Sequence, residues 1–295
     1  DPANPLVGKL QRRWDARAAA NFICGGLSAG LAVVAYLGHL AGAIPAGRLP
    51  AIYVAACAIM AVGLFCVFLE IGRKLRFIYA LRRPQSSWMT REVYVVAAMY
   101  PMIAVNFWRP RPALDASIAL AALAFLYCQA RILHAAKGIP AWRVPQMPAM
   151  LIATGLFEGL GALVLTLAVL QSAIPTWLGW PIAALAGINA ALWHVYRTRA
   201  KAAGIPPLAR AEIARVTPWL HALGHGLPAA GATAVFAAAS PPALVTAAIG
   251  AIAGGALWKY WVIVHASYQQ GFALPKLPRR GSGRRSAWAG ARMGA

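Results

Sequence analysis

The chain of 295 residues is 60% hydrophobic and only 12% charged, and its net charge is +21. Soluble globular domains are nearer half apolar and a quarter charged, so this composition argues against one and predicts an integral membrane protein. The basic residues lie mostly in the segments between apolar runs, and no nucleic-acid-binding motif is visible, so we expect no nucleic-acid partner.

Apolar runs follow one another along the chain, each close to the ~20 residues that a helix needs to cross a bilayer. We predict an all-α, polytopic membrane protein with eight transmembrane helices, arranged as two four-helix bundles. The predicted spans are 20–44, 50–71, 93–108, 114–135, 148–173, 178–196, 218–240 and 243–266. Residues 1–277 form the predicted membrane domain, and residues 278–295, rich in Gly, Arg and Ser, form a predicted disordered tail.

The basic residues are distributed unevenly between the two predicted faces. Most lie in the N-terminal segment, in the 2–3, 4–5 and 6–7 connections and in the tail, whereas the opposite face carries only Arg48, Arg109 and Arg111. Because cytoplasmic loops are enriched in Lys and Arg, this asymmetry predicts that both termini and these connections are cytoplasmic.

The connection between the second and third spans, "EIGRKLRFIYALRRPQSSWMTRE", occupies residues 70–92. Leu75, Ile78 and Leu81 recur at helical spacing among arginines, a pattern typical of a short amphipathic helix at the membrane surface. The same basic and aromatic side chains could bind a soluble partner, or they could serve topology alone. The candidate docking residues are Arg76, Arg82, Arg83, Trp88 and Arg91.

Several polar groups share one predicted depth near the cytoplasmic face. Glu70 ends the second span, and Arg73 follows at i+3, where it can face Glu70 on a helix. Asn21 begins the first span, and Arg131 and His134 lie one turn apart at the end of the fourth. Such groups could bind a quinone headgroup, or they could be interfacial ion pairs and snorkelling side chains.

Glu158 lies well inside the fifth span, in "ATGLFEGLGAL". A charge at this depth is expensive and is a functional hypothesis by default. Glu158 could relay protons, or it could hydrogen-bond a neighbouring helix. Lys259, nearer the cytoplasmic face, is expected to snorkel toward the headgroups.

The sequence predicts no metal centre and no haem in this chain. The four cysteines form no CxxC pair, whereas clusters and zinc sites need closely spaced thiolates. His221 and His225 share one helix face, but the six histidines do not form ligand pairs on facing helices at two depths.

Two stretches resemble a known family more specifically. "LEIGRKLRFIYALRRPQSSWMTREV" resembles the connection after the second span in the dimethyl sulfoxide reductase anchor family, the DmsC/NrfD/PsrC-type subunits. "YCQARILHAAKGIPAWRVPQMPAMLIATGLFEG" resembles that family's fourth-to-fifth span segment. "WDARAAANFICGGLSAGL" and "GALWKYWVIVHASYQQGFALP" are similar to its first span and to the end of some members.

This resemblance implies a function. Such subunits are eight-helix, usually haem-free anchors of the bacterial inner membrane. They exchange electrons between the quinone pool, ubiquinone or menaquinone, and an iron–sulfur subunit that serves a molybdenum catalytic subunit. The clusters and the molybdenum cofactor would then belong to the partners.

The resemblance also suggests roles for the polar residues. Some members have a His where this chain has Glu70, which implies that Glu70 exchanges the proton. Asn21, Arg73, Arg131 and His134 would bind the quinone. Two other classes stay open: a secondary transporter, favoured by Glu158 and the helix-interrupting Pro101 and Pro228, and a haem-b cytochrome subunit.

Overall fold

The computed structural model describes residues 8–71, 78–79, 81–170, 173–238 and 241–269. Within these residues the chain is helical, and extended backbone pairs only at one bridge between Leu10 and Tyr268. The prediction of an all-α protein is confirmed. The tail at 278–295 and Leu75 of the predicted surface helix lie outside the described residues.

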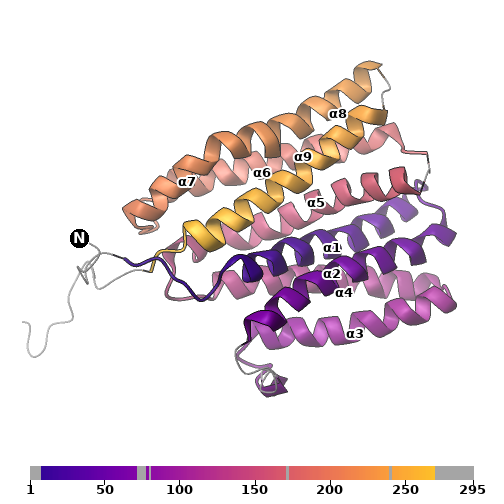
Figure 1. The fold of residues 1–295 in the computed structure, drawn as a ribbon. Coiled ribbons are helices and arrows are strands. Elements are labelled where there is room, and N and C mark those ends of the chain that lie inside the picture. Colours follow the sequence, from indigo (N-terminus) through magenta and orange to yellow (C-terminus); the bar gives the residue numbers. More distant parts are fainter. Residues whose placement is uncertain (1–7, 72–77, 80, 171–172, 239–240, 270–295) are drawn as a thin grey trace, which may run out of the picture.

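Nine α-helices and two π-helical segments are described, and most of the α-helices run side by side along the long axis of the molecule (Figure 1). The first group is α1 (Ala16–Leu40), α2 (Leu49–Glu70), α3 (Trp88–Trp108) and α4 (Pro112–His134). The second group is α5 (Met147–Val169), α6 (Gly179–Arg199), α7 (Pro207–Trp219), α8 (Leu227–Ala238) and α9 (Pro241–Tyr260). The π-helical segments are η5 (Leu220–Gly226), which joins α7 to α8, and η6 (Trp261–His265), which extends α9.

Six described helices are long and apolar enough to cross a membrane, which supports a multi-pass membrane protein. They are Ala16–Leu40, Ala46–Glu70, Pro112–His134, Met147–Val169, Thr176–Arg199 and Pro242–His265. The helix α3 and the continuous helix α7–η5–α8 are not among these six helices. Each carries charge at one end: α3 has Arg91 and Glu92 in its first turns, and α7 has Arg210, Glu212 and Arg215.

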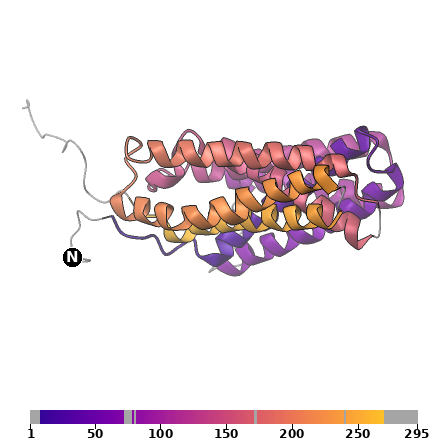
Figure 2. The same ribbon diagram turned by 90° about the horizontal axis from the view of Figure 1, so that it is seen from above.

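The helix α1 is central, because it packs against α2, α4, α5 and α9. Its Gly30 meets Gly155 and Gly159 of α5 so closely that a Cβ at any of the three would overlap backbone or a packed side chain. Small residues of this kind let transmembrane helices approach each other. Further contacts link α2 with α3, α3 with α4, α5 with α6 and α9, and α8 with α6 and α9. Seen from above, the helices lie in more than one layer (Figure 2).

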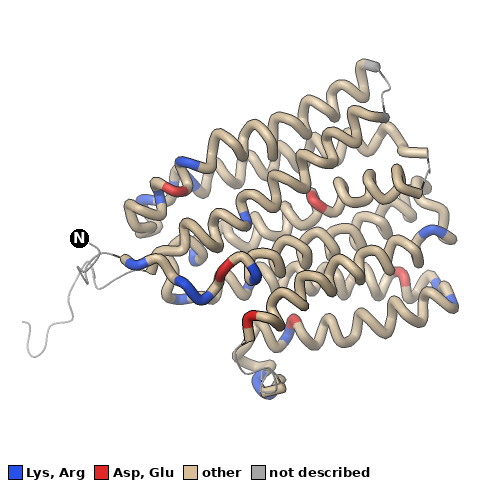
Figure 3. The backbone as a smooth tube through the Cα atoms, viewed as in Figure 1, with Lys and Arg blue, Asp and Glu red and all other residues tan. Residues whose placement is uncertain are grey.

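The segment before α1 contacts the last described residues of the chain. The Gln11 amide nitrogen donates to the Ser267 hydroxyl at 3.1 Å and to the Ile263 carbonyl at 3.2 Å. Both terminal segments therefore lie at one end of the helices, and most Lys and Arg residues gather at the same end, called the basic end below (Figure 3). This distribution agrees with the uneven charge read from the sequence.

Candidate functional site

A cavity of about 280 Å³ lies at the basic end, between the ends of α1, α2, α3 and α4. Its walls are mostly apolar, and three polar side chains reach it: Asn21, Glu70 and Glu92. The apolar lining is Trp14, Ala18, Phe22, Leu64, Val67, Ile71, Leu81, Met89, Val93 and Ile132. Apolar walls with a few convergent polar groups are typical of small-molecule sites.

A buried polar network stands behind this cavity. Gln129 of α4 donates from Nε2 to the Asn21 carbonyl at 3.1 Å, and it also acts electrostatically on the Glu92 carboxylate. Asn21 Oδ1, Glu92 Oε1 and Gln129 Oε1 are buried acceptors with no hydrogen-bond partner within the described part of the chain. Leaving such a group unsatisfied costs about 1–3 kcal/mol, so unsatisfied acceptors lie in the network directly behind the cavity.

Gly25 explains how α4 comes close enough to α1 to build this network. A Cβ at Gly25 would overlap the Gln129 amide and the Phe125 ring. The glycine therefore opens the space that Gln129 fills, and it fixes the amide beside Asn21, one helical turn earlier on α1.

Glu70 lies half-buried at the last residue of α2, on the cavity wall. Arg17 of α1 reaches this helix end: its Nη1 donates to the Leu69 carbonyl at 3.2 Å, and its Nη2 pairs with Asp15 at 2.7 Å. The charge of Arg17 acts on Glu70 as well. Arg73, the partner expected from the sequence, lies outside the described residues, so Arg17 is the cation that the structure brings to Glu70.

Trp88, the first residue of α3, contacts two arginines. The guanidinium carbons of Arg91 and Arg131 lie 4.1 and 5.1 Å from its ring centroids. Arg91 also donates to the carbonyls of Pro84 and Gln85, at 2.7 and 2.8 Å. These hydrogen bonds hold residues 84–85 of the 2–3 connection against the start of α3. Arg91 therefore has a structural role whether or not a partner binds there.

The structure brings together only part of the predicted site. Asn21 and Glu70 line the cavity, whereas Arg131 lies on Trp88 and His134 at the end of α4, and neither is among the lining residues. Of the predicted docking residues, Arg82 and Arg83 are exposed, and Arg76 lies outside the described residues.

Sequence reasoning missed Glu92 and Gln129. The third span was predicted to begin at residue 93, but α3 begins at Trp88, which places Glu92 in the helix and buries it. Ser87 caps this start by accepting from the Thr90 backbone N–H at 3.3 Å. A serine ahead of an apolar run is a helix-start signal, and reading it would have moved Glu92 out of the connection.

A second buried polar centre joins α5 to α9. Lys259 Nζ lies 2.5 Å from Glu158 Oε2 and donates to the Phe22 carbonyl of α1 at 3.1 Å, and neither charged side chain has any exposed area. The expectation that Lys259 snorkels is wrong. Gly26 and Gly255 are the reason: a Cβ at Gly26 would overlap the Lys259 ammonium, and one at Gly255 would overlap the Glu158 carboxylate.

Comparison with known proteins adds no family to this description. No family model matches the sequence, and no curated protein is similar to it. Within the described residues, no group of three or more His, Cys, Asp or Glu side chains could hold a metal ion. The functional interpretation therefore depends on the cavity and on the buried polar groups.

Proposed function

We propose that this protein is the quinone-reactive membrane anchor of a molybdenum–iron–sulfur oxidoreductase. It would exchange electrons between the quinone pool of the bacterial inner membrane and an iron–sulfur subunit at the basic end, in the cytoplasm. In this proposal α3 and α7–η5–α8 are the seventh and eighth spans, and the chain forms two four-helix bundles. The observation that carries the proposal is the cavity lined by Asn21, Glu70 and Glu92.

The cavity fits a quinone headgroup in size and chemistry. Its volume of about 280 Å³ is close to the lower end of the range for small-molecule sites, roughly 300–1,000 Å³. Its apolar walls suit a ring and the start of an isoprenoid tail. The unpartnered acceptors Asn21 Oδ1 and Glu92 Oε1 suit the two hydroxyls of a quinol.

The protein's own groups would then handle the protons. A quinol supplies two electrons and two protons when it is oxidised. Glu92 is placed to accept a proton inside the cavity, and Gln129 holds its carboxylate in position. Glu70, half-buried at the cavity edge, would pass a proton to water, and the Arg17–Asp15 ion pair lies beside it. Asn21 orients the ring.

The basic end supports the choice of partner. An iron–sulfur subunit with an acidic docking face would be steered there by charge, because complementary potentials accelerate association. Arg82 and Arg83 are exposed on this side, next to the cavity-lining Leu81. A cluster docked here would stand beside the quinone site.

The test is quinol turnover by the isolated native complex. We expect Glu92→Gln and Glu70→Gln to leave assembly intact and to lower turnover by roughly 10²-fold or more, the usual contribution of a general acid or base. The matched control is Asp115→Asn, because Asp115 is also a buried carboxylate but lies at the other end of α4. Normal turnover in both glutamate variants would contradict the proposal.

One observation favours a second class, a secondary transporter. The Glu158–Lys259 pair is buried midway along α5, a position typical of coupling-ion sites. A transporter would act alone in vesicles, without a redox partner. A haem-b subunit would instead show a Soret band after purification.

A further inference from the structure

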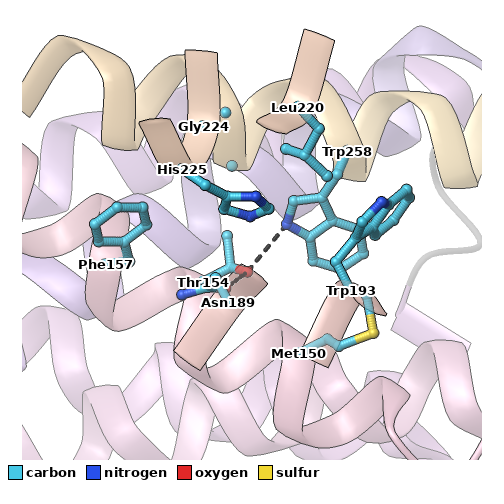
Figure 4. Close-up of a pocket in the computed structure, with 11 residues that line it drawn as sticks. Met150, Thr154, Phe157, Asn189, Trp193, Leu220, Gly224, His225 and Trp258 are labelled. Carbon is cyan, nitrogen blue, oxygen red and sulfur yellow. Dashed lines mark hydrogen bonds between the residues drawn. The ribbon is translucent and has the colours of Figure 1, made fainter. Parts of the chain in front are cut away.

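The buried pair Glu158–Lys259 has a neighbouring cavity that the proposed quinone chemistry does not use. Figure 4 shows the residues that line this cavity. Its free volume is about 10 Å³, which is room for about one water molecule. Thr154, Asn189, Trp258 and His225 supply its polar edge. Thr154 Oγ1 donates to Asn189 Oδ1 at 2.7 Å and accepts from Trp258 Nε1 at 3.0 Å.

Glu158 lies directly behind the wall of this cavity. Gly255 lines the cavity, and a Cβ there would overlap Glu158 Oε1. Thr154 precedes Glu158 by one turn on the same face of α5. Oε1 is buried and has no hydrogen-bond partner in the described residues, whereas Oε2 binds Lys259. Gly255 therefore borders both the cavity and the unpartnered oxygen, and it places no side chain of its own between them.

The side chain of His225 reaches the cavity from η5, and Figure 4 shows its imidazole above Thr154 and between Phe157 and Trp258. The π-helical turn that presents it has an identifiable cause. Pro228 cannot donate to the Gly224 carbonyl, so the α-helical ladder is interrupted there. Gly224 also meets Gly254 of α9 backbone to backbone. Single π-helical turns of this kind occur frequently at functional sites.

His221 connects His225 to the surface. Its Nδ1 lies 3.1 Å from the Nδ1 of His225, and its own side chain is exposed. Arg197 and His194 of α6 act on it electrostatically.

The depth of His221 follows from the length of the helix. From Pro207 to Ala238 the continuous helix is about 48 Å long at 1.5 Å per residue, more than the ~30 Å of a hydrocarbon core. The charged α7 turns therefore extend past the hydrocarbon. Trp219, 62% exposed, suits the interface, and His221 follows it by two residues, less than one helical turn.

We propose that His221, His225 and the cavity form a proton path from the basic end to Glu158. His221 gives its Nδ1 proton to His225 Nδ1, and His225 releases a proton into the cavity, where it reaches Glu158 Oε1. Glu158 becomes a neutral acid, Lys259 keeps its proton and its bond to Phe22, and His221 is reprotonated from water. Among the described residues, the other titratable groups that act on Glu158 are Lys259 of α9 and Cys24 of α1.

The test is the protonation of Glu158, followed by infrared spectroscopy on the full chain in lipid. A rapid drop in pH should produce the carbonyl band of a protonated carboxyl. The double variant Glu158→Gln/Lys259→Met, which leaves no buried charge, should lack this band and so assigns it. We expect His225→Phe and His221→Phe each to slow its rise by roughly tenfold or more, as loss of a positioned acid–base group does.

The control is His39→Phe, because His39 lies at the other end of the helices, where its Nδ1 contacts the Ile44 carbonyl at 2.8 Å. His221 is exposed, so its variant keeps the fold even where His225→Phe does not. Unchanged rates in the His221 and His225 variants, or no Glu158 band at any pH at which the protein stays folded, would overturn the path. The measurement needs no quinone and no partner, so it fails or succeeds independently of the proposed function.

Discussion

Glu92 of α3 and Glu158 of α5 are both buried carboxylates, yet their surroundings differ in kind. Glu158 meets an ammonium at 2.5 Å across a glycine-lined contact, whereas Glu92 meets one amide and the wall of a 280 Å³ cavity. Two consecutive glycines of α1 account for the two surroundings. Gly25 leaves space for Gln129, near Glu92, and Gly26 leaves space for Lys259, the partner of Glu158. Burial alone therefore does not determine the role of an acidic residue. The role depends on which neighbouring side chain the helix packing brings to the carboxylate.

The largest effect should come from unpairing Glu158 and Lys259. Lys259→Met leaves a buried carboxylate without a counter-charge, and breaking such pairs costs about 3–5 kcal/mol of unfolding free energy. The double variant Glu158→Gln/Lys259→Met should recover most of this loss. Denaturant unfolding of the purified protein measures both. Equal losses in the single and double variants would mean that the pair is not coupled.

The helix contact that brings the two regions together should be nearly as sensitive. Gly159→Ala would force a methyl group into the Gly30 backbone, and overpacking of this kind costs about 1–3 kcal/mol. Gly187→Ala on α6 is the matched control, because nothing lies within 4 Å of a Cβ there. That change should be neutral or stabilise by up to about 1 kcal/mol. The same unfolding assay distinguishes them, and similar effects would contradict the close α1–α5 contact.

Glu92→Gln should separate stability from activity. Because Glu92 has no cation partner among the described residues, an amide should replace it at a cost below about 1.5 kcal/mol, the net value of one hydrogen bond. The variant should unfold almost as the parent does while quinol turnover falls. A loss as large as that of Lys259→Met would show that Glu92 is structural.

The smallest effect should be at the start of α1, outside both buried regions. Asp15 caps the helix by accepting from the Arg17 backbone N–H at 2.8 Å. Hydrogen bonds from Arg17 lower the pKa of Asp15 below its usual value. Its stabilisation is therefore present above the unfolded-state pKa and is lost as pH falls through the folded-state pKa.

Asp15→Ala should lower the free energy of unfolding by about 0.5–1 kcal/mol near neutral pH. The lower value is expected because the side chain is solvated. Below the folded-state pKa of Asp15, parent and variant should converge. Unfolding curves at neutral and acidic pH compare the stabilities of parent and variant. A stability difference that grows on acidification would contradict the lowered pKa of Asp15.

The sequence was sufficient to predict an all-helical membrane protein but not the contacts between its helices. Apolar runs near 20 residues predict the helices, and the uneven arginines predict a basic end, because both depend on local composition. The positions of Asn21 and Glu70 on one cavity could be anticipated, since Asn21 begins the first predicted span and Glu70 ends the second at the same predicted depth.

The partner of each buried group could not be read from the sequence. Lys259 and Glu158 are far apart in the chain, and only the approach of α1, α5 and α9 at small residues buries them together. Glu92 was placed in a connection because its helix begins with a polar turn. The wrong expectation for Lys259 has the same origin, since snorkelling is inferred from depth alone.

The central claim, that this chain is a quinone-reactive anchor, is tested most directly by gentle detergent isolation of the native complex. Mass spectrometry and metal analysis would then identify the proteins, metals and lipids that co-purify. The account predicts molybdenum, iron, a ferredoxin-like subunit and a bound quinone, with the quinone reduced in amount when Asn21 is changed to Leu. A lone polypeptide without metal or quinone would contradict it.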